Sequence, residues 1–252
     1  MTDDAPRLSD FYHLIRRDEV GSTNDEAKRL AYAQAPEGTL VWAASQNAGR
    51  GRRGRPWVSP PGNLYLSLLL RPVCPALQAA QLGFVTAHAL GEALTPLLGR
   101  APVTYKWPND VLVSGHKIAG ILLESEMSSG ELVEFVIIGM GVNVAAAPEA
   151  TEYPATSLRA ERVSNVTPGL LLAGFAHHFE YWYANWRTEG FAPIRHAWLA
   201  RAGGLGEPVQ VRLEKATLLG RFLDLDEEGA LVLEGEGGRR RIAAGEVFPA
   251  AR

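Results

Sequence analysis

The chain has 252 residues, which is long enough for a sizeable hydrophobic core and for one or two domains. Hydrophobic residues make up 46% and charged residues 21%, as in ordinary globular proteins. The 28 Asp and Glu residues outnumber the 25 Lys and Arg residues, so the net charge is −3. A general nucleic-acid binder usually has an excess of basic residues, and this chain has none. Any binding of anions must therefore depend on a local cluster of basic residues.

Export and membrane insertion are not indicated by the sequence. The first twenty residues have no apolar stretch behind a basic start, which argues against a signal peptide. The longest apolar runs, such as residues 63–72, are too short to span a bilayer. The single Cys74 cannot form an internal disulfide and is expected to be a passive thiol. These features predict a cytoplasmic protein with no membrane partner.

Strands and helices are both predicted along the first 204 residues. Thr23 has the character of a helix N-cap, with Glu26 as its capping partner three residues later. Pro108 predicts a turn between two strands, and Ser114–Gly115 predicts a hairpin. Hydrophobic patterns predict strands at 38–45, 63–72, 103–107, 110–126 and 132–144, and helices at 76–94 and 170–187.

The pattern changes at Gly203 and Gly204. From Pro208 onward, four or five short strands separated by turns are predicted. A β module of this size, roughly 45 residues, is marginal by itself and usually packs against a neighbour. The sequence therefore predicts two domains, residues 1–204 and residues 205–252.

The segment 48–57 concentrates four arginines among three glycines and ends in Trp57. Glycines let the backbone approach an anion, and arginines form bidentate hydrogen bonds to phosphate or carboxylate. Trp57 offers a flat face for stacking on a nucleobase. A solvated loop or an RNA-binding arginine–glycine patch is the alternative, but such patches usually repeat, and this run occurs once between two predicted strands. The pattern favours a small anionic ligand.

Three further segments are candidates for a binding site. "GSTN" at 21–24 could simply cap a helix, and alone it favours that role. Lys106, Asp110 and Lys117 bracket one hairpin, so two lysines and a carboxylate could converge there, although Asp110 could also just stabilise the turn. The glycines of "GMGVNV" at 139–144 predict close approach of a ligand or another backbone, and no following helix supports a dinucleotide fingerprint.

Taken together and in order, these segments resemble biotin–protein ligases. The resemblance implies an α+β fold, in which a mixed β-sheet catalytic domain packed with helices precedes a small C-terminal SH3-like β-barrel. Five motifs in register over residues 21–143 make it specific. They are "GSTN" at 21–24, "GRGRRGR" at 49–55 with Trp57, "KWPNDV" at 106–111, "KIAGILLE" at 117–124 and G-x-G-x-N at 139–143.

The resemblance implies a two-step reaction. The carboxylate of biotin attacks the α-phosphate of ATP, giving biotinoyl-5′-AMP and pyrophosphate, and an acceptor lysine then attacks the mixed anhydride. The implied acceptor is the biotin carboxyl carrier protein of acetyl-CoA carboxylase, with a homodimer as a possible assembly and no DNA partner. Mg²⁺ is expected to travel with ATP rather than to occupy a fixed protein site, and Asp110 is the one candidate protein contact for it.

The same resemblance implies roles for individual residues. The catalytic candidates are Lys117, which contacts the biotin carboxylate or the phosphate, Arg52 of the closing loop, and Asp110, which orients the metal or the acceptor lysine. The biotin-binding candidates are Ser22, Thr23, Asn24, Gln46, Gly49, Arg50, Arg52, Lys117 and Gly120. The candidates for binding ATP and the adenylate are Arg50, Arg52, Arg53, Arg55, Trp57, Asn109, Lys117 and Asn143.

Two departures and three alternatives accompany this interpretation. About twenty residues precede "GSTN", too few for the winged-helix DNA-binding domain of some relatives, so a repressor role is not expected. Pro56 stands where some relatives have a basic residue. A lipoate–protein ligase is the nearest alternative function, and the intact arginine loop favours biotin. An RNA-binding protein is disfavoured by the acidic charge, and a peptide-binding scaffold leaves the special segments unexplained.

Overall fold

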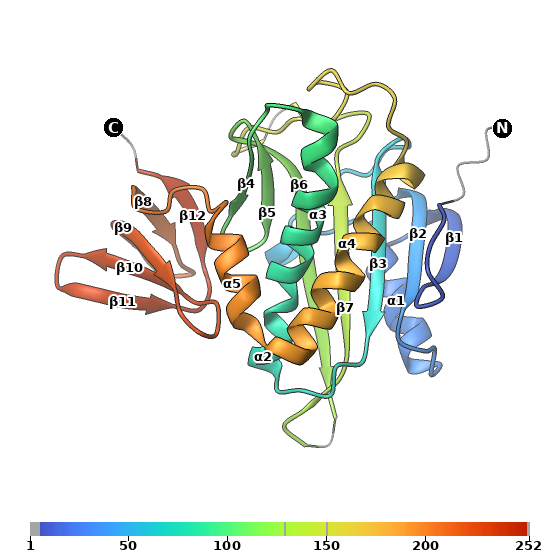
Figure 1. Ribbon diagram of the computed structural model, residues 1–252, viewed down its shortest axis with the longest axis horizontal. Helices are drawn as coiled ribbons and strands as arrows, with labels where there is room; N and C mark the ends of the chain where they lie inside the picture. The colour runs from blue at the N-terminus through green and yellow to red at the C-terminus, as the bar shows by residue number, and fades with distance from the viewer. Residues whose placement is uncertain (1–5, 129, 150, 251–252) are drawn as a thin grey trace.

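A computed structural model describes residues 6–128, 130–149 and 151–250. Seven strands form one large sheet in the order β1-β2-β3-β7-β6-β5-β4, with a second, five-stranded sheet at one end of the molecule (Figure 1). Strand β1 is parallel to β2, and all other neighbours in the large sheet are antiparallel. The predicted α+β class with a mixed sheet is confirmed. The strands are β1 (His13–Val20), β2 (Thr39–Gln46), β3 (Leu64–Leu70), β4 (Val103–Lys106), β5 (Asp110–Val113), β6 (His116–Met127) and β7 (Val133–Val142).

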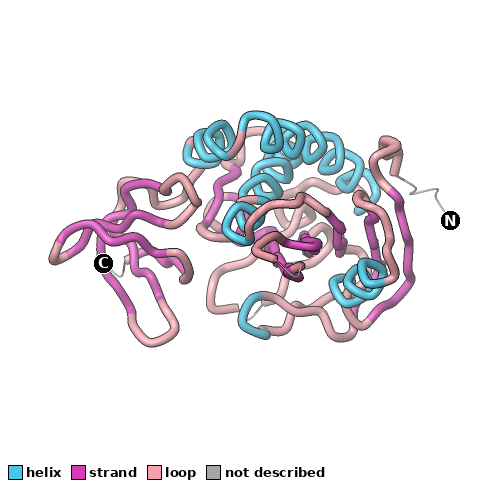
Figure 2. The backbone as a smooth tube through the Cα atoms, turned by 90° about the horizontal axis from the view of Figure 1, so that it is seen from below, coloured by secondary structure: helices cyan, strands magenta, loops and turns pink. Residues whose placement is uncertain are grey.

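Helices cover both faces of the large sheet (Figure 2). The predicted helix at 76–94 is two helices that meet at Gln81. Neither α5 nor the edge strand β1 was expected from the sequence. The long aromatic helix is confirmed. The helices are α1 (Thr23–Tyr32), α2 (Ala76–Ala80), α3 (Leu82–Leu98), α4 (Pro168–Glu189) and α5 (Phe191–Leu199), with a short 3₁₀ turn at Arg52–Gly54.

The core has two layers, because hydrophobic side chains of the central strands point alternately to the two faces of the sheet. Leu68 of β3 and Ile138 of β7 belong to the large cluster beneath α3 and α4. Their neighbours Leu69 and Ile137 point to the other face and pack against α1. Successive strand residues face opposite sides of a sheet, so one sequence pattern fills both layers. Helix α1 covers only part of this face of the sheet, and a cavity lies in the uncovered part.

The C-terminal strands form an antiparallel sheet in the order β11-β10-β9-β8-β12. Among the described residues, β11 and β12 are not hydrogen-bonded to each other, so the expected SH3-like barrel is an open sheet here, with an order compatible with such a barrel. Its hydrophobic residues join the core cluster beneath α3 and α4, which supplies the neighbour that so small a module needs. The strands are β8 (Pro208–Arg212), β9 (Thr217–Leu225), β10 (Leu231–Gly235), β11 (Gly238–Ile242) and β12 (Glu246–Pro249).

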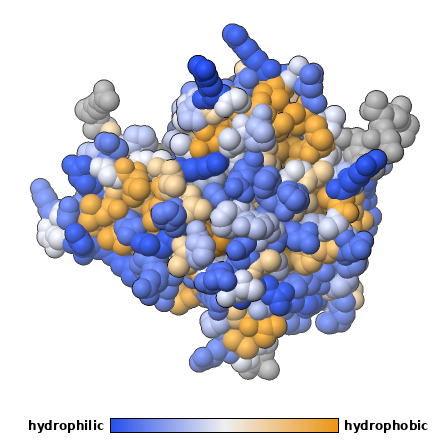
Figure 3. Space-filling view, viewed as in Figure 1, coloured by the Kyte–Doolittle hydropathy of each residue, from blue (hydrophilic) through white to orange (hydrophobic). Residues whose placement is uncertain are grey.

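The surface is mixed in character. On the face seen in Figure 1, hydrophobic side chains form patches that polar and charged side chains interrupt (Figure 3). Met127 and Leu132, at the tip where β6 turns into β7, are among the exposed hydrophobic residues. Within the described part of the chain, no helix has the length and apolar character needed to cross a membrane.

A close contact between α3 and β4 gives a stability prediction. A Cβ at Gly91 would lie 2.1 Å from Tyr105 Oη, and Tyr105 is buried and stacked on Trp198. We predict that Gly91→Ala lowers the free energy of unfolding by about 1–2 kcal/mol, because overpacking outweighs the gain in helix propensity. Urea denaturation measures this. The matched control is Gly174→Ala in α4, whose Cβ would meet Ala93 at an ordinary 3.6 Å. Equal stability of the two variants would contradict the prediction.

Candidate active site

A cavity of about 410 Å³ opens on the α1 side of the large sheet, at the N-terminal end of that helix. Strands β6 and β7 present Gly120, Gly139 and Gly141 to it instead of large side chains. Glu246 and Phe248 reach the same cavity from the C-terminal sheet. Most of the residues predicted for the site are therefore brought together in one place. The predicted residues that line the cavity are Ser22, Thr23, Asn24, Gln46, Arg50, Arg52, Arg55, Trp57, Asn109, Asp110, Lys117, Gly120 and Asn143.

Two predicted residues, Gly49 and Arg53, lie outside this lining. Gly49 lies beneath the arginine loop, where a Cβ would come within 2.6 Å of the Trp57 carbonyl oxygen, so its role is to let the loop fold tightly. Arg53 is exposed, with a φ of 56°, at the tip of the loop. Neither Gly49 nor Arg53 lines the cavity in this conformation.

One end of the cavity offers uncharged hydrogen-bonding groups. Helix α1 begins at Thr23 and its N-cap is Ser22, so the expectation that Thr23 caps the helix with Glu26 is wrong. Thr23 instead donates to Gln46, with its backbone N and its Oγ1 at 2.8 and 3.1 Å from Gln46 Oε1. The Gln46 amide donates in turn to Ser59 Oγ at 3.0 Å. Hydroxyl and amide groups of this kind suit a neutral polar ligand group.

The other end of the cavity carries two lysines and a carboxylate. Strands β4 and β5 pair Lys106 with Asp110, and β6 returns beside them with Lys117. Lys106 Nζ lies 2.7 Å from Asp110 Oδ2, and Lys117 Nζ lies 2.6 Å from Asp110 Oδ1. The convergence predicted from the hairpin is thus present in the structure. The three groups together carry one net positive charge, which favours an anionic ligand.

The protonation state of Asp110 follows from its surroundings. Burial alone would raise the pKa of this carboxyl group, but the charges and hydrogen bonds of Lys117 and Lys106 outweigh burial and hold the pKa below its usual value of 3.8. Both carboxylate oxygens are bound to ammonium groups. In this arrangement Asp110 orients the two lysines, and a carboxylate with so low a pKa is a weak proton acceptor.

Trp57 lies across the glycines of the sheet. A Cβ at Gly141 would stand 2.4 Å from Trp57 Nε1, and one at Gly120 would stand 3.1 Å from the same ring system. The Lys117 ammonium lies 5.3 Å from the indole centroid, within reach of a cation–π interaction. The sequence predicted that a ligand or backbone would approach these glycines, whereas here the close neighbour is a side chain. The glycines keep the indole flat against the sheet.

The arginine loop makes different contacts at each arginine. Arg52 donates to the carbonyl of Gly245 at 3.1 Å and to Asn109 Oδ1 at 3.4 Å, and burial lowers the pKa of its guanidinium. Arg55 pairs with Glu246 at 3.0 Å. The loop therefore bridges the two sheets across the mouth of the cavity. Arg50 turns the other way, toward α1.

Asn143 and the segment that follows β7 form another wall. The Asn143 amide donates to the Thr156 carbonyl at 3.0 Å, and Lys117 N donates to the Pro154 carbonyl at 2.7 Å. These bonds hold residues 151–155 beside the cavity, where Tyr153 joins the lining.

Sequence reasoning missed several lining residues. Lys106 was recognised as part of the hairpin but was not assigned to the site. Its ammonium group lies 4.8 Å from the ring centroid of Tyr153 and 5.5 Å from the ring centroid of Phe248. The position of Lys106 opposite Asp110 was the signal for it. No sequence signal marks Tyr153, Glu246 or Phe248, because they reach the cavity through the packing of distant segments.

The described residues contain no group of three or more His, Cys, Asp or Glu side chains placed to hold a metal ion. Asp110, the one residue considered for such a contact, has both oxygens bound to lysines.

Comparisons with known proteins extend this description. Residues 16–143 match the model of the biotin/lipoate A/B protein ligase family, and residues 204–248 match that of the biotin protein ligase C-terminal domain. A biotin–acetyl-CoA-carboxylase ligase of Paracoccus denitrificans is 49% identical over 233 residues, which cover 90% of this chain and 96% of the relative. The bifunctional ligase/repressor BirA of Bacillus subtilis is 37% identical, with 93% and 73% covered. A structure of biotin protein ligase from Aquifex aeolicus in complex with biotin and ATP has a TM-score of 0.81 at 30% identity, with 94% and 98% covered.

The chain therefore belongs to the biotin/lipoate A/B protein ligase family. Its similarity to biotin protein ligases continues through their C-terminal domain, so the resemblance predicted from the five motifs is confirmed.

The charge triad predicts a pH-dependent stability. Asp110→Asn leaves two ammonium groups without their counter-ion, so we expect the free energy of unfolding to fall by about 3 kcal/mol at neutral pH. The lowered pKa of Asp110 means that its contribution is complete above 3.8 and is lost as the pH falls through the folded-state value. Urea denaturation of the wild type and of Asp110→Asn, from neutral pH down to below pH 3.8, should show that the difference in their free energies of unfolding becomes smaller in acid. A difference that stays constant with pH would contradict this account.

Proposed function

We propose that this protein is an ATP-dependent biotin–protein ligase that joins biotin to a lysine of a carrier protein through biotinoyl-5′-AMP. The observation that carries the proposal is the division of one cavity into an uncharged end, at Thr23 and Gln46, and a cationic end, at Lys106 and Lys117. Biotin has the matching polarity, with a neutral urea ring at one end and a carboxylate at the other.

The first step needs a carboxylate and a triphosphate to meet, although both are anions. Lys117 and Arg52 line the place where they would meet, and their charges offset the repulsion and stabilise the negative charge that develops at the α-phosphate. In the proposal, Trp57 stacks on the adenine, and Asn109 and Asn143 help to hold the adenylate. Mg²⁺ would accompany the ATP phosphates and offset part of their negative charge.

The second step is attack of an acceptor lysine amine on the acyl carbon of the mixed anhydride, which forms an amide bond and releases AMP. The amine must lose a proton, and the low pKa of Asp110 makes that carboxylate a better counter-ion for ammonium groups than a base. We assign Asp110 the task of holding Lys117 in position. The arginine loop, which bridges the two sheets, covers the cavity and keeps water from the anhydride.

The remaining roles and partners belong to the same proposal. The carrier is the biotin carboxyl carrier protein of acetyl-CoA carboxylase, and acetyl-CoA carboxylase is the substrate in the name of the Paracoccus relative. The protein acts in the cytoplasm, without a DNA partner, and a homodimer is its candidate assembly. We also propose residues 1–204 and 205–252 as its two domains, with Glu246 and Phe248 of the second completing the site of the first.

Lys117 gives the sharpest test of the first step. Lys117→Ala removes an ammonium group from the cationic end, so we expect biotin-dependent exchange of pyrophosphate into ATP to fall by at least about a hundredfold. Exchange at the wild-type rate would refute the assignment of Lys117.

Arg52 tests the closure of the loop. Arg52→Gly removes the bonds to Gly245 and Asn109, so we expect biotinoyl-5′-AMP to escape into solution faster than from the wild type. Chromatography of the filtrate after a single turnover measures the escape. Release at the wild-type rate would show that this contact does not hold the adenylate.

The overall reaction is tested by mass spectrometry of the carrier protein after incubation with the enzyme, MgATP and either biotin or lipoate. The proposal predicts a gain of one biotin on one lysine and no gain from lipoate. A lipoyl adduct instead would assign the protein to the other branch of its family.

A further inference from the structure

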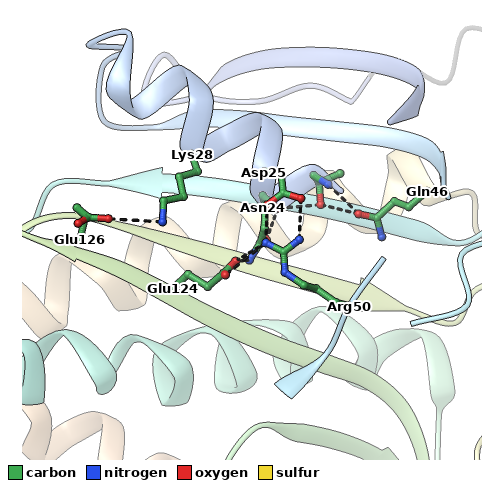
Figure 4. A network of polar contacts seen from close by, with 9 residues as sticks. Asn24, Asp25, Lys28, Gln46, Arg50, Glu124 and Glu126 are labelled. Carbon is green, nitrogen blue, oxygen red and sulfur yellow. Dashed lines mark hydrogen bonds and ion pairs between the residues drawn. The ribbon is translucent and has the colours of Figure 1, made fainter. Parts of the chain in front are cut away.

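Arg50, the first arginine of the loop, is engaged by carboxylates of the protein itself. Its two terminal nitrogens lie 2.7 and 2.5 Å from the two oxygens of Asp25, in a bidentate pair. The second nitrogen also lies 3.3 Å from each oxygen of Glu124 on β6. Figure 4 shows the guanidinium between these two side chains, one from α1 and one from the sheet. Arg50 thus points toward α1, away from the cationic end of the cavity.

Glu124 is itself fixed from the other side. Asn24 Nδ2 donates to Glu124 Oε2 at 2.5 Å, and Ser67 Oγ donates to Asn24 Oδ1 at 2.6 Å. A Cβ at residue 139 would lie 2.1 Å from Asn24 Oδ1, so only Gly139 leaves room for this amide. The carboxylate is therefore also held by a hydrogen bond that does not involve Arg50.

These bonds join a longer chain that returns to the far end of the loop. Ser67 Oγ lies 2.8 Å from Thr23 Oγ1, and Thr23 bonds to Gln46. Gln46 bonds to Ser59, whose hydroxyl donates to the Trp57 carbonyl at 2.8 Å. The loop is thus tied at its start, through Arg50, and at its end, through Trp57, to one continuous network, in which Thr23 and Gln46 also form the uncharged end of the cavity.

We propose that Glu124 and Asp25 are positioning residues that hold Arg50 as the fixed anchor of the arginine loop, so that Arg52, and not Arg50, meets the phosphate of the adenylate. The first half of this proposal concerns the ligand-free protein, and the second half rests on the function proposed above. The anchor sets the start of the loop, and the stretch from Arg52 to Arg55 spans the cavity mouth.

The half-buried environment supports this role. The side chains of Arg50 and Glu124 are 30% and 33% exposed, so their charges are partly shielded from solvent. The hydrogen bond from Arg50 lowers the pKa of Asp25, and the same pairing raises that of Arg50. An exposed single ion pair contributes little to stability, whereas a bidentate pair within a network holds a geometry.

The test begins with limited trypsin digestion of the ligand-free protein, because the loop contains cleavable bonds after Arg50, Arg52 and Arg53, whereas the Arg55–Pro56 bond resists trypsin. Glu124→Gln keeps the size of the side chain and removes its charge, and we expect cleavage in the loop to become about threefold to tenfold faster. The matched control is Glu126→Gln, two residues along the same strand, which loses only an ion pair with Lys28 and a bond from Tyr32. It should be cleaved in the loop at the wild-type rate.

A double-mutant cycle separates an anchor from a direct ligand contact. If Glu124 acts through Arg50, Arg50→Gln and Glu124→Gln each raise the release of biotinoyl-5′-AMP, and the double variant is no worse than Arg50→Gln alone. Because Asp25 still holds Arg50 in Glu124→Gln, the KM for ATP changes in the same direction in both single variants and by less in Glu124→Gln. Thermal unfolding of each protein shows whether the effect is confined to the loop.

The opposite results would overturn the proposal. Loop cleavage of Glu124→Gln at the wild-type rate would show that Glu124 does not hold the loop. A higher KM for ATP in Arg50→Gln together with a lower one in Glu124→Gln would show that Arg50 contacts the phosphates itself. Faster loop cleavage in Glu124→Gln with no ligase activity in the wild type would leave the anchor standing and remove the proposed function.

Discussion

The ion triad of Lys106, Asp110 and Lys117 is the interaction on which the site depends. Two ammonium groups cannot share a largely buried position without a counter-ion, and Asp110 supplies one for both. Because each lysine takes one oxygen of the carboxylate, the triad has a fixed geometry and a remaining positive charge. Lys117 then lies beneath Trp57, and the neighbouring Asn109 receives Arg52. The cationic end of the cavity is assembled around this one carboxylate.

Space for the site comes from glycines in the sheet, which have no side chains to fill the cavity. Gly139 leaves room for Asn24 and Gly141 leaves room for Trp57, where even a methyl group would lie within 2.4 Å of a neighbouring atom. The two glycines are alternate residues of β7 and so face the same side of the sheet. The small residues of β7 therefore leave space for Asn24 and Trp57, which line the cavity.

Most residues of this site were predicted from the resemblance of five short motifs to biotin–protein ligases, and the hairpin geometry by itself predicted only that Lys106, Asp110 and Lys117 could converge. A hairpin turn at Pro108 places Lys106 and Asp110 opposite each other, and the next strand adds Lys117. The N-cap role of Thr23 was predicted wrongly, because a hydroxyl at a helix start usually caps the helix, and here Thr23 hydrogen-bonds to Gln46 instead. Local rules do not reveal such tertiary competition for a side chain.

Contacts between distant segments were beyond such reasoning. Glu246 reaches the arginine loop across 191 residues of chain, and Arg50 reaches Glu124 across 74. Nothing in either local pattern specifies the partner. The open C-terminal sheet was likewise not predictable, because the number of short strands does not say whether the outer two will pair.

In the proposed function, one cavity holds both ends of the adenylate. The direct test is a crystal structure with a stable analogue, in which a phosphate ester replaces the reactive anhydride. We predict the urea ring at Thr23 and Gln46, the phosphate between Arg52 and Lys117, and the adenine against Trp57. A phosphate bound to Arg50, or a urea ring away from Gln46, would contradict it.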